Sequence, residues 1–243
     1  MTSLKLLIDA DYFFYRAASA SQEELEFTSD LTVIVGNFIE AKRIVKSEID
    51  KLCAMYRTKD LLLCFTDIVN FRKSIEPTYK GNRVKPKPAG YLKLKQWGMD
   101  TYPSLMKPAL EADDVLGILA TNNSIDDFVL VSPDKDMLQL PVRIYNLKEE
   151  LTQTPEGALR KLYEQCLTGD ATDGYSGAKG IGPKTAAKIL DKVKDGDYWP
   201  VVVEAFKKAG QTEEDALTSL RLARILQASD WDAEQQKPIL FSP

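Results

Sequence analysis

The stretch from Glu111 to Asp136 constrains the fold most, because it joins a helix that starts with acids to a strand that ends in them. Apolar residues recur at helical spacing from position 115, which places the three acids before them in the first helical turn. The apolar run 128–131 is short and continuous, as in a strand buried on both faces of a parallel sheet. Five clustered carboxylates repel one another unless cations neutralise them, so the stretch predicts a Mg²⁺ or Mn²⁺ site.

The same pattern, an apolar run that leads to an acid, occurs twice earlier in the chain. Leu4–Ile8 leads to Asp9, and Asp60–Phe65 leads to Asp67. Ligands of open α/β sheets bind at the carboxyl ends of the strands, so these acids are expected at one edge of a parallel sheet. Periodicity predicts further elements: helices over 12–20, 31–56, 155–167 and 212–228, and strands over 98–102 and 142–145. The predicted fold class is α/β.

The composition excludes several kinds of chemistry. The chain contains no histidine, which rules out His-based triads, His general bases and His-ligated zinc. Its three cysteines lack paired spacing and fit buried, reduced thiols. No apolar run approaches the roughly 18 residues of a membrane span, and the amino terminus lacks a basic region with a cleavage site. We therefore expect a cytoplasmic protein without a membrane partner.

The charge distribution matters more than the net charge. A formal charge of −4 and a pI of about 5.2 argue against nucleic acid as a partner. The basic segment (residues 68–110), however, has nine basic and two acidic residues, a net charge of +7, with aromatic residues interleaved. Such a segment beside a carboxylate cluster fits a phosphate-bearing polymer whose chemistry needs metal. A solvated, flexible basic loop is the alternative interpretation.

The carboxyl-terminal third contains a second phosphate-binding pattern. Thr154 and Pro155 start a helix, which leads to two further acids and then to the glycine turn (residues 177–182). Gly180 and Gly182 let the backbone turn tightly, and Pro183 opens a helix whose first amide groups face outward. Helix, glycine turn and helix with nearby lysines predict a clamp for phosphates that is independent of base sequence.

Nine acids in all lie where strands end, helices begin or the glycine turn approaches. They are Asp9, Asp67, Glu111, Asp113, Asp114, Asp134, Asp136, Asp170 and Asp173. Converging on one edge, they would hold two metal ions, which can activate water and stabilise the leaving oxygen in phosphodiester cleavage.

Seven motifs match, in order and over nearly the whole chain, those of the 5′-nuclease (flap endonuclease) superfamily. They are residues 9–11, 65–67, 79–83, 111–114, 132–136, 169–173 and 180–182. Within that superfamily the chain most resembles the 5′→3′ exonucleases of podovirus phages. That closer resemblance is carried by residues 65–73, 151–154, 169–177 and 223–226.

The resemblance implies a twisted, mostly parallel sheet flanked by helices, and two regions. Residues 1–150 would form the nuclease core with the arch-like basic segment, and residues 151–243 a helical region with a helix-hairpin-helix-like motif. It also implies a monomer that uses two Mg²⁺ or Mn²⁺ ions, with K⁺ at the glycine turn. The activity implied is 5′→3′ exonuclease action on duplex DNA, and on RNA–DNA hybrids and flaps, in phage replication and recombination in the host cytoplasm.

The resemblance also assigns roles to single residues. Lys80 and Arg83 match the family's active-site lysine and arginine, which contact the scissile phosphate. Asp11 stands where many relatives carry an uncharged polar residue, so it is not predicted to be a metal ligand. Contacts with nucleic acid are expected from Arg16, Arg72, Lys73, Tyr79, Lys179, Gly180, Gly182, Lys184 and Thr185.

Two other interpretations were weighed. Residues 6–11 resemble the nucleophile motif of haloacid-dehalogenase-type phosphatases, in which Asp9 would become a covalent nucleophile. That alternative leaves the basic segment and the glycine turn without a role. A DNA-binding module without activity would lack some of the motif acids, and all of them are present. The basic segment, interrupted by Pro and Gly, is also short for a long helical arch, which leaves open whether single-stranded flaps are threaded through it.

Overall fold

The structure is a computed structural model that describes residues 4–194 and 196–243. A six-stranded sheet forms its centre, in the spatial order β5 (Ser104–Met106), β4 (Leu61–Phe65), β1 (Lys5–Asp9), β6 (Phe128–Val131), β7 (Arg143–Tyr145) and β8 (Glu150–Thr152). Neighbouring strands run parallel except β7 and β8, which are antiparallel. The central strands β1 and β6 are almost wholly buried, because helices cover both faces of the sheet. The predicted α/β class with a mostly parallel sheet is confirmed.

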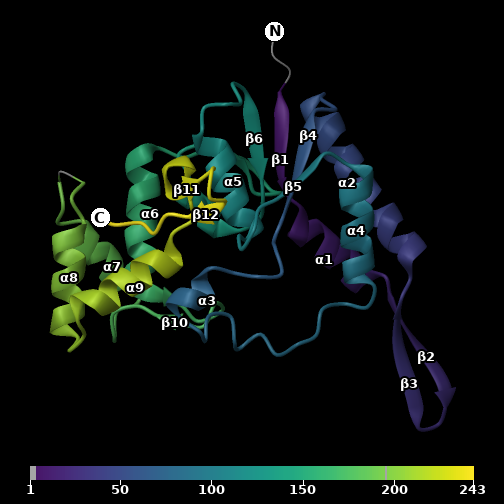
Figure 1. Cartoon of the computed structure of the whole chain (residues 1–243), viewed down its shortest axis with the longest axis horizontal. Helices are drawn as coiled ribbons and strands as arrows, with labels where there is room; N and C mark the ends of the chain where they lie inside the picture. The colour runs from purple at the N-terminus through teal and green to yellow at the C-terminus, as the bar shows by residue number, and fades with distance from the viewer. Residues whose placement is uncertain (1–3, 195) are drawn as a thin grey trace.

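The side chains of β1 alternate between two hydrophobic cores. Leu6 and Ile8 point to one face, which is covered by α1 (Ala10–Ala20), α2 (Phe38–Tyr56) and α4 (Tyr91–Thr101) (Figure 1). Leu7 points to the other face, where it shares a core with α5 (Ala112–Thr121). This arrangement fixes the carboxyl end of β1, with Asp9, between helices from both layers.

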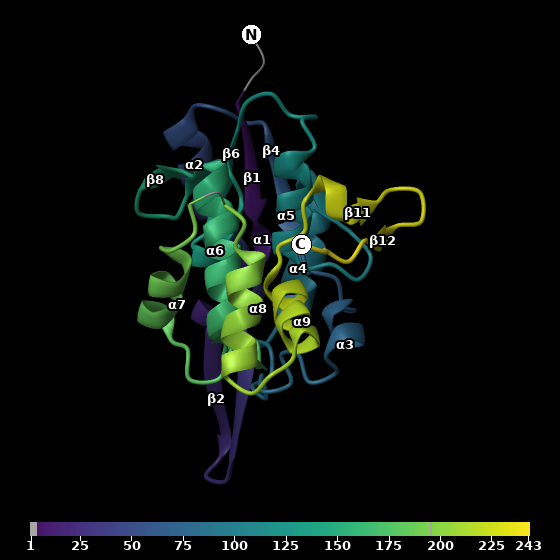
Figure 2. The same ribbon diagram turned by 90° about the vertical axis from the view of Figure 1, so that its left-hand side faces the viewer.

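A third core lies among the carboxyl-terminal helices, which stand together at one end of the molecule (Figure 2). They are α6 (Pro155–Thr168), α7 (Pro183–Leu190), α8 (Trp199–Lys208) and α9 (Glu213–Ala223). The remaining elements are short: α3 (Arg72–Ile75), η1 (Lys135–Gln139), β9 (Gly169–Asp170), β10 (Tyr175–Ser176), η2 (Ala228–Asp230), β11 (Trp231–Asp232) and β12 (Lys237–Pro238). Within the described ranges, no helix is both long and apolar enough to cross a membrane.

A β-hairpin replaces the start of the predicted helix 31–56, so that prediction is wrong at its amino-terminal end. β2 (Gln22–Thr28) and β3 (Leu31–Gly36) pair antiparallel in a separate sheet that projects from the body (Figure 1). Residues 32–35 are Thr-Val-Ile-Val, and such β-branched side chains favour strands. Asn37 then caps α2, since its side chain accepts a hydrogen bond from the Glu40 amide at 3.1 Å.

Two further boundaries differ from the predictions. The strand expected over 98–102 is wrong, because α4 continues through Gly98 to Thr101 and β5 begins at Ser104. A glycine is required inside that helix, since a Cβ at position 98 would lie 2.3 Å from the Phe14 ring. The helix predicted over 212–228 is capped by Thr212 as expected but ends at Ala223.

Candidate active site

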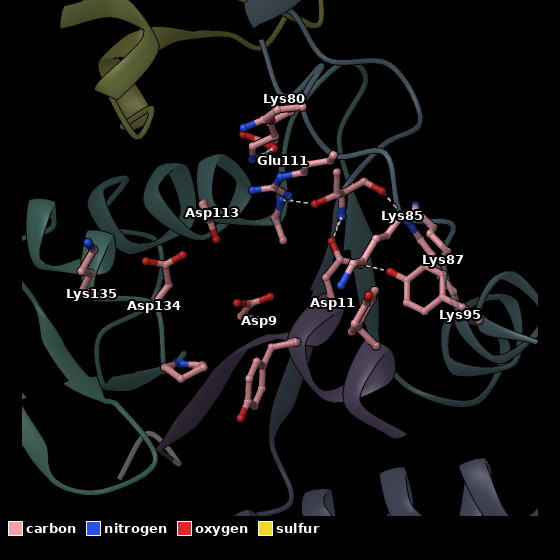
Figure 3. Close-up of a pocket in the computed structure, with 18 of the residues that line it drawn as sticks. Asp9, Asp11, Lys80, Lys85, Lys87, Lys95, Glu111, Asp113, Asp134 and Lys135 are labelled. Atoms are coloured by element: carbon pink, nitrogen blue, oxygen red, sulfur yellow. Dashed lines mark hydrogen bonds and ion pairs between the residues drawn. The ribbon is translucent and has the colours of Figure 1, made fainter. Parts of the chain in front are cut away.

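A cavity of about 1070 Å³ opens at the carboxyl ends of the parallel strands (Figure 3). The cavity is lined by four carboxylates that were predicted from the sequence to bind metal. We call them the pocket acids: Asp9, Glu111, Asp113 and Asp134. Asp9 is the last residue of β1, Asp134 follows β6, and the other two lie at the start of α5. Basic side chains line the same cavity: Lys80, Arg83, Lys85, Lys87, Lys95 and Lys135. The cavity therefore joins negative and positive walls around one space.

The negative charge of each pocket acid makes ionisation of its neighbours less favourable. Burial, with the charges of Asp11 and Asp134, raises the pKa of Asp9 to about 7. Burial and the charges of Asp9, Asp134 and Glu111 raise the pKa of Asp113 well above its usual range. A bound cation would favour the ionised forms of both groups, so the electrostatics of this wall fit a cation site.

Lys80 and Arg83 connect the pocket acids to the region around β9 and β10. The Lys80 ammonium donates to Glu111 and lies 3.5 Å from Asp173, while Arg83 donates to Asp173 at 2.6 Å. Burial opposes the charge of Glu111, yet Lys80 and Arg72 hold its pKa below the ordinary value. Lys80 has a φ of 56°, in the left-handed region, and its N–H donates to the Asp173 carbonyl at 2.7 Å. Strained backbone of this kind persists where the surroundings hold it, often at functional sites.

Three more predicted acids form a second acidic group, Asp136, Asp170 and Asp173. Burial raises the pKa of the Tyr175 hydroxyl, and the charges of these three acids raise it further. One oxygen of Asp136, Oδ2, accepts from Gln165 at 2.7 Å. Its other oxygen, Oδ1, is buried without a hydrogen bond in the described part of the chain and lies 3.8 Å from the Lys161 ammonium. A buried, unsatisfied carboxylate oxygen fits a site that takes a further positive ligand.

Asp114 and Arg72 form a buried ion pair, although the sequence predicted a metal ligand and a contact with DNA. Asp114 is fully buried and accepts two hydrogen bonds from the Arg72 guanidinium, at 2.7 and 2.8 Å. Arg72 also donates to the backbone carbonyls of Leu222 and Arg224, at 3.0 and 2.5 Å. As the side chains stand, Asp114 does not line the cavity, and Arg72 is only 2% exposed. The pair ties α3 and α5 to the end of α9.

Tyr79 is also buried, with 2% exposure, so its ring is not exposed for the predicted contact with nucleic acid. Its hydroxyl lies 3.1 Å from a Glu111 oxygen and 2.9 Å from an Asp173 oxygen, so its one proton can be donated to either, and it lies between the two groups of acids. Asp67 does not line the cavity; its carboxylate accepts from the amides of Ile68 and Ala109, both at 2.7 Å. These contacts shape the loop that precedes Glu111.

The glycine turn forms a separate, open surface. A shallow hollow of about 650 Å³ is lined by Lys179, Gly180 and Gly182, and both Lys184 and Thr185 are exposed beside it. Gly180 has a φ of 76°, which favours glycine, and nothing lies within 4 Å of a Cβ built at either glycine. α7 begins at Pro183, as predicted. The two other predicted contacts, Arg16 and Lys73, are exposed but outside the cavity.

Sequence analysis missed several residues that line the cavity, namely Tyr12, Tyr15, Tyr91, Lys85, Lys87, Lys95 and Lys135. For Lys85, Lys87, Tyr91 and Lys95 the signal was the mixture of aromatic and basic residues within the basic segment, whereas the other three lie outside that segment. In the described ranges, no group of three carboxylates is arranged to hold a metal ion as the side chains stand. The fit to a cation therefore rests on charge, burial and the shared cavity.

Comparison with known proteins identifies related sequences and folds. The family model for the 5′-3′ exonuclease, N-terminal resolvase-like domain, matches residues 5–163. The exonuclease of Escherichia phage T7 is 28% identical, over 98% of this chain and 93% of the phage protein. The exodeoxyribonuclease of Enterobacteria phage T3 is 27% identical, over 98% of this chain and 92% of its own. The structure of T5 5′-exonuclease with divalent metal ions (zinc) bound has a TM-score of 0.64 at 18% identity, over 90% of this chain and 88% of that one.

The structural likeness confirms the fold, and the family match covers well over half of the chain. The family match supports the nuclease interpretation and gives no support to the phosphatase alternative. The chain therefore belongs to the 5′-3′ exonuclease family and is a 5′→3′ exonuclease.

Proposed function

We propose that this protein uses divalent metal ions to remove nucleotides stepwise from the 5′ ends of duplex DNA, as a monomer in phage replication and recombination. The observation that carries the proposal is the single cavity in which the pocket acids face Lys80, Arg83 and further lysines. Cleavage of a phosphodiester backbone uses cations, which the acids can hold, and fixed positive charge, which binds the strand and is supplied by the basic side chains. The phage relatives named above are an exonuclease and an exodeoxyribonuclease, which agrees with this reaction.

The acids divide into two candidate cation sites. The pocket acids would hold one Mg²⁺ or Mn²⁺ ion, and the second acidic group, with its unsatisfied Asp136 oxygen, would hold another. When bound, such ions would supply an activated water and neutralise charge on the leaving oxygen. The T5 5′-exonuclease was solved with divalent metal ions (zinc) bound, which supports a requirement for divalent metal. Binding requires the carboxylates to reorient, because no group of three among the described residues is arranged to hold a metal ion as the side chains stand.

The chain's own residues orient the substrate between these sites. Lys80 contacts Glu111 and lies near Asp173, so it is placed to bind a phosphate that spans the two groups of acids. Arg83, half exposed beside it, would hold the same phosphate or its neighbour. Preorganised positive charge at the scissile phosphate stabilises charge that develops in the transition state. The glycine turn would bind the phosphate backbone of the duplex away from the cavity, with K⁺ bridging the turn and a phosphate.

The basic segment suits an end that is opened at the site. Residues 82–90 contain no helix, and Val84 is 87% exposed, so this side of the cavity is not closed by a regular helical arch. A blunt or recessed 5′ end could enter from the side and unpair at the acids while the duplex rests on the glycine turn. We propose such ends as the main substrates, with RNA strands in hybrids and flaps as further ones.

A linear duplex labelled at one 5′ terminus, compared with the same duplex labelled at the 3′ terminus, tests the polarity. In Mg²⁺ we expect early release of the 5′ label, largely as mononucleotides, and survival of the opposite strand. Closed circular duplex should resist, since it has no end. Early release of the 3′ label, efficient cutting of closed circles, or activity in EDTA would overturn the proposal.

A further inference from the structure

Asp11 lies in the cavity among the pocket acids, yet neither of its oxygens is free (Figure 3). Oδ1 accepts a hydrogen bond from the Tyr91 hydroxyl at 2.7 Å. Oδ2 accepts one from the Thr66 amide at 2.9 Å. The carboxylate thus joins α1, which carries it, to the first residue of α4 and to the residue that follows β4.

Thr66 extends this connection to the helix that carries two pocket acids. Its Oγ1 accepts from the amide of Ala112, the first residue of α5, at 2.9 Å. Its carbonyl accepts from the Lys95 ammonium, which is 8% exposed. Thr66 therefore connects the Ala112 amide and the Lys95 ammonium to the Asp11 carboxylate.

Tyr91 connects the same chain of contacts to the basic segment. It directly follows residues 82–90, and the Lys87 ammonium lies 5.0 Å above its ring. The basic side chains that line the cavity, Lys87 among them, form its basic wall. A continuous series of contacts therefore connects this wall, through Tyr91, Asp11 and Thr66, to the start of α5.

We propose that Asp11 is a positioning residue, which holds the basic wall and the pocket acids in the arrangement that cleavage requires. This inference rests on the proposed function. Asp11 does so with its two hydrogen bonds and not with its charge, unlike a metal ligand. Displacement of catalytic groups by about 1 Å can lower a rate about 10²-fold without changing substrate affinity.

The conservative variant Asp11→Asn distinguishes the two roles. An asparagine oxygen can still accept from the Thr66 amide, and its NH₂ can donate to Tyr91, because a tyrosine hydroxyl accepts as well as donates. Asp11→Ala removes both bonds and Tyr91→Phe removes one. The matched control is Tyr56→Phe, which removes a tyrosine–carboxylate bond to Glu150 (2.8 Å) far from the cavity.

Single-turnover cleavage in Mg²⁺ gives the first readout. Asp11→Ala should be slowed about 10²-fold and Tyr91→Phe about 10-fold, with duplex affinity unchanged within about 2-fold. Asp11→Asn should stay within about 3-fold of the parent, and Tyr56→Phe should match it. Loss of activity in Asp11→Asn equal to that of Asp11→Ala would assign the role to charge and overturn the proposal. Full activity in Asp11→Ala would overturn it too.

Hydrogen exchange gives a second readout that does not depend on activity. The amides of Thr66 and Ala112 should exchange faster in Asp11→Ala than in the parent and remain protected in Asp11→Asn. Unchanged protection in Asp11→Ala would contradict the proposal. If the parent protein cleaves no DNA, the proposed function fails. The exchange rates still decide whether Asp11 holds Thr66 and the start of α5 in place. Should Asp11→Ala not fold, Tyr91→Phe carries both measurements.

Discussion

Replacing Arg72 by alanine should destabilise the fold strongly, although the sequence suggested a surface contact with DNA. The guanidinium makes two hydrogen bonds to Asp114, one to Glu111 and two to backbone carbonyls, and all of these partners are buried. Removing one member of a buried ion pair costs about 3–5 kcal/mol, because the other charge stays buried without compensation. In a chain of 243 residues each kcal/mol lowers Tm by about 2–4 °C, so we expect a loss on the order of 10 °C.

Thermal and urea unfolding of Arg72→Ala measure this loss, with Lys73→Ala as the matched control. Lys73 is the next residue of α3 and is exposed, so its removal should change the free energy of unfolding by less than about 0.5 kcal/mol. Replacing the pair together, as Arg72→Met with Asp114→Leu, should recover part of the stability, because the Asp114 charge no longer stays buried alone. The recovery is incomplete, since buried carbonyls and amides that the pair had bonded lose their partners. A stable Arg72→Ala variant with weakened duplex binding would refute the reasoning and return Arg72 to the DNA-contacting surface.

Four other perturbations test the site. Lys80→Ala should slow single-turnover cleavage by about 10²-fold or more, with a smaller change in affinity; an effect on affinity alone would reduce Lys80 to a steering charge. Asp134→Asn should abolish cleavage and leave duplex binding intact or tighter, because a repelling charge is lost, and normal turnover in Mg²⁺ would rule out its metal role. Bulky residues at Gly180 and Gly182 should weaken duplex binding and flatten its dependence on salt. Because the folded pKa of Asp9 (about 7) lies above its ordinary 3.8, the native state binds the extra proton between these values, so metal-free stability should fall as pH rises from about 4 to about 7. Asp9→Asn should reduce that slope in urea titrations, and the raised pKa of Asp113 accounts for a part that remains.

The parts of the fold that follow from local sequence were predictable. Short apolar runs that end in acids gave β1, β4 and β6, and the acids before Val115 gave the start of α5. The hairpin was missed because the apolar spacing of α2 was extended backwards through residues 31–36. Its own signals were the β-branched run and Asn37, a favourable cap just before the true first turn.

The division of labour among the acids could not be read from the sequence. Asp113 and Asp114 are neighbours, but successive helical residues point about 100° apart, so one lies in the cavity and the other in the core. The partner that decides this, Arg72, lies 42 residues earlier and was predicted for DNA because of its basic surroundings. Only the tertiary fold shows that its charge is already neutralised.

The projecting hairpin has a consequence for handling the protein. β2 and β3 form a two-stranded sheet of their own, with apolar side chains such as Phe27 (64% exposed) and Leu31 (50% exposed) on the surface. Open strand edges with apolar neighbours invite edge-to-edge association between copies. Glu24, Glu26 and Asp30 give every hairpin the same negative charge, so two copies that meet repel each other. Concentrated salt shortens the range of that repulsion to about 3 Å at 1 M. Storage at low ionic strength and a pH well above the pKa of carboxylates should therefore keep the chains apart.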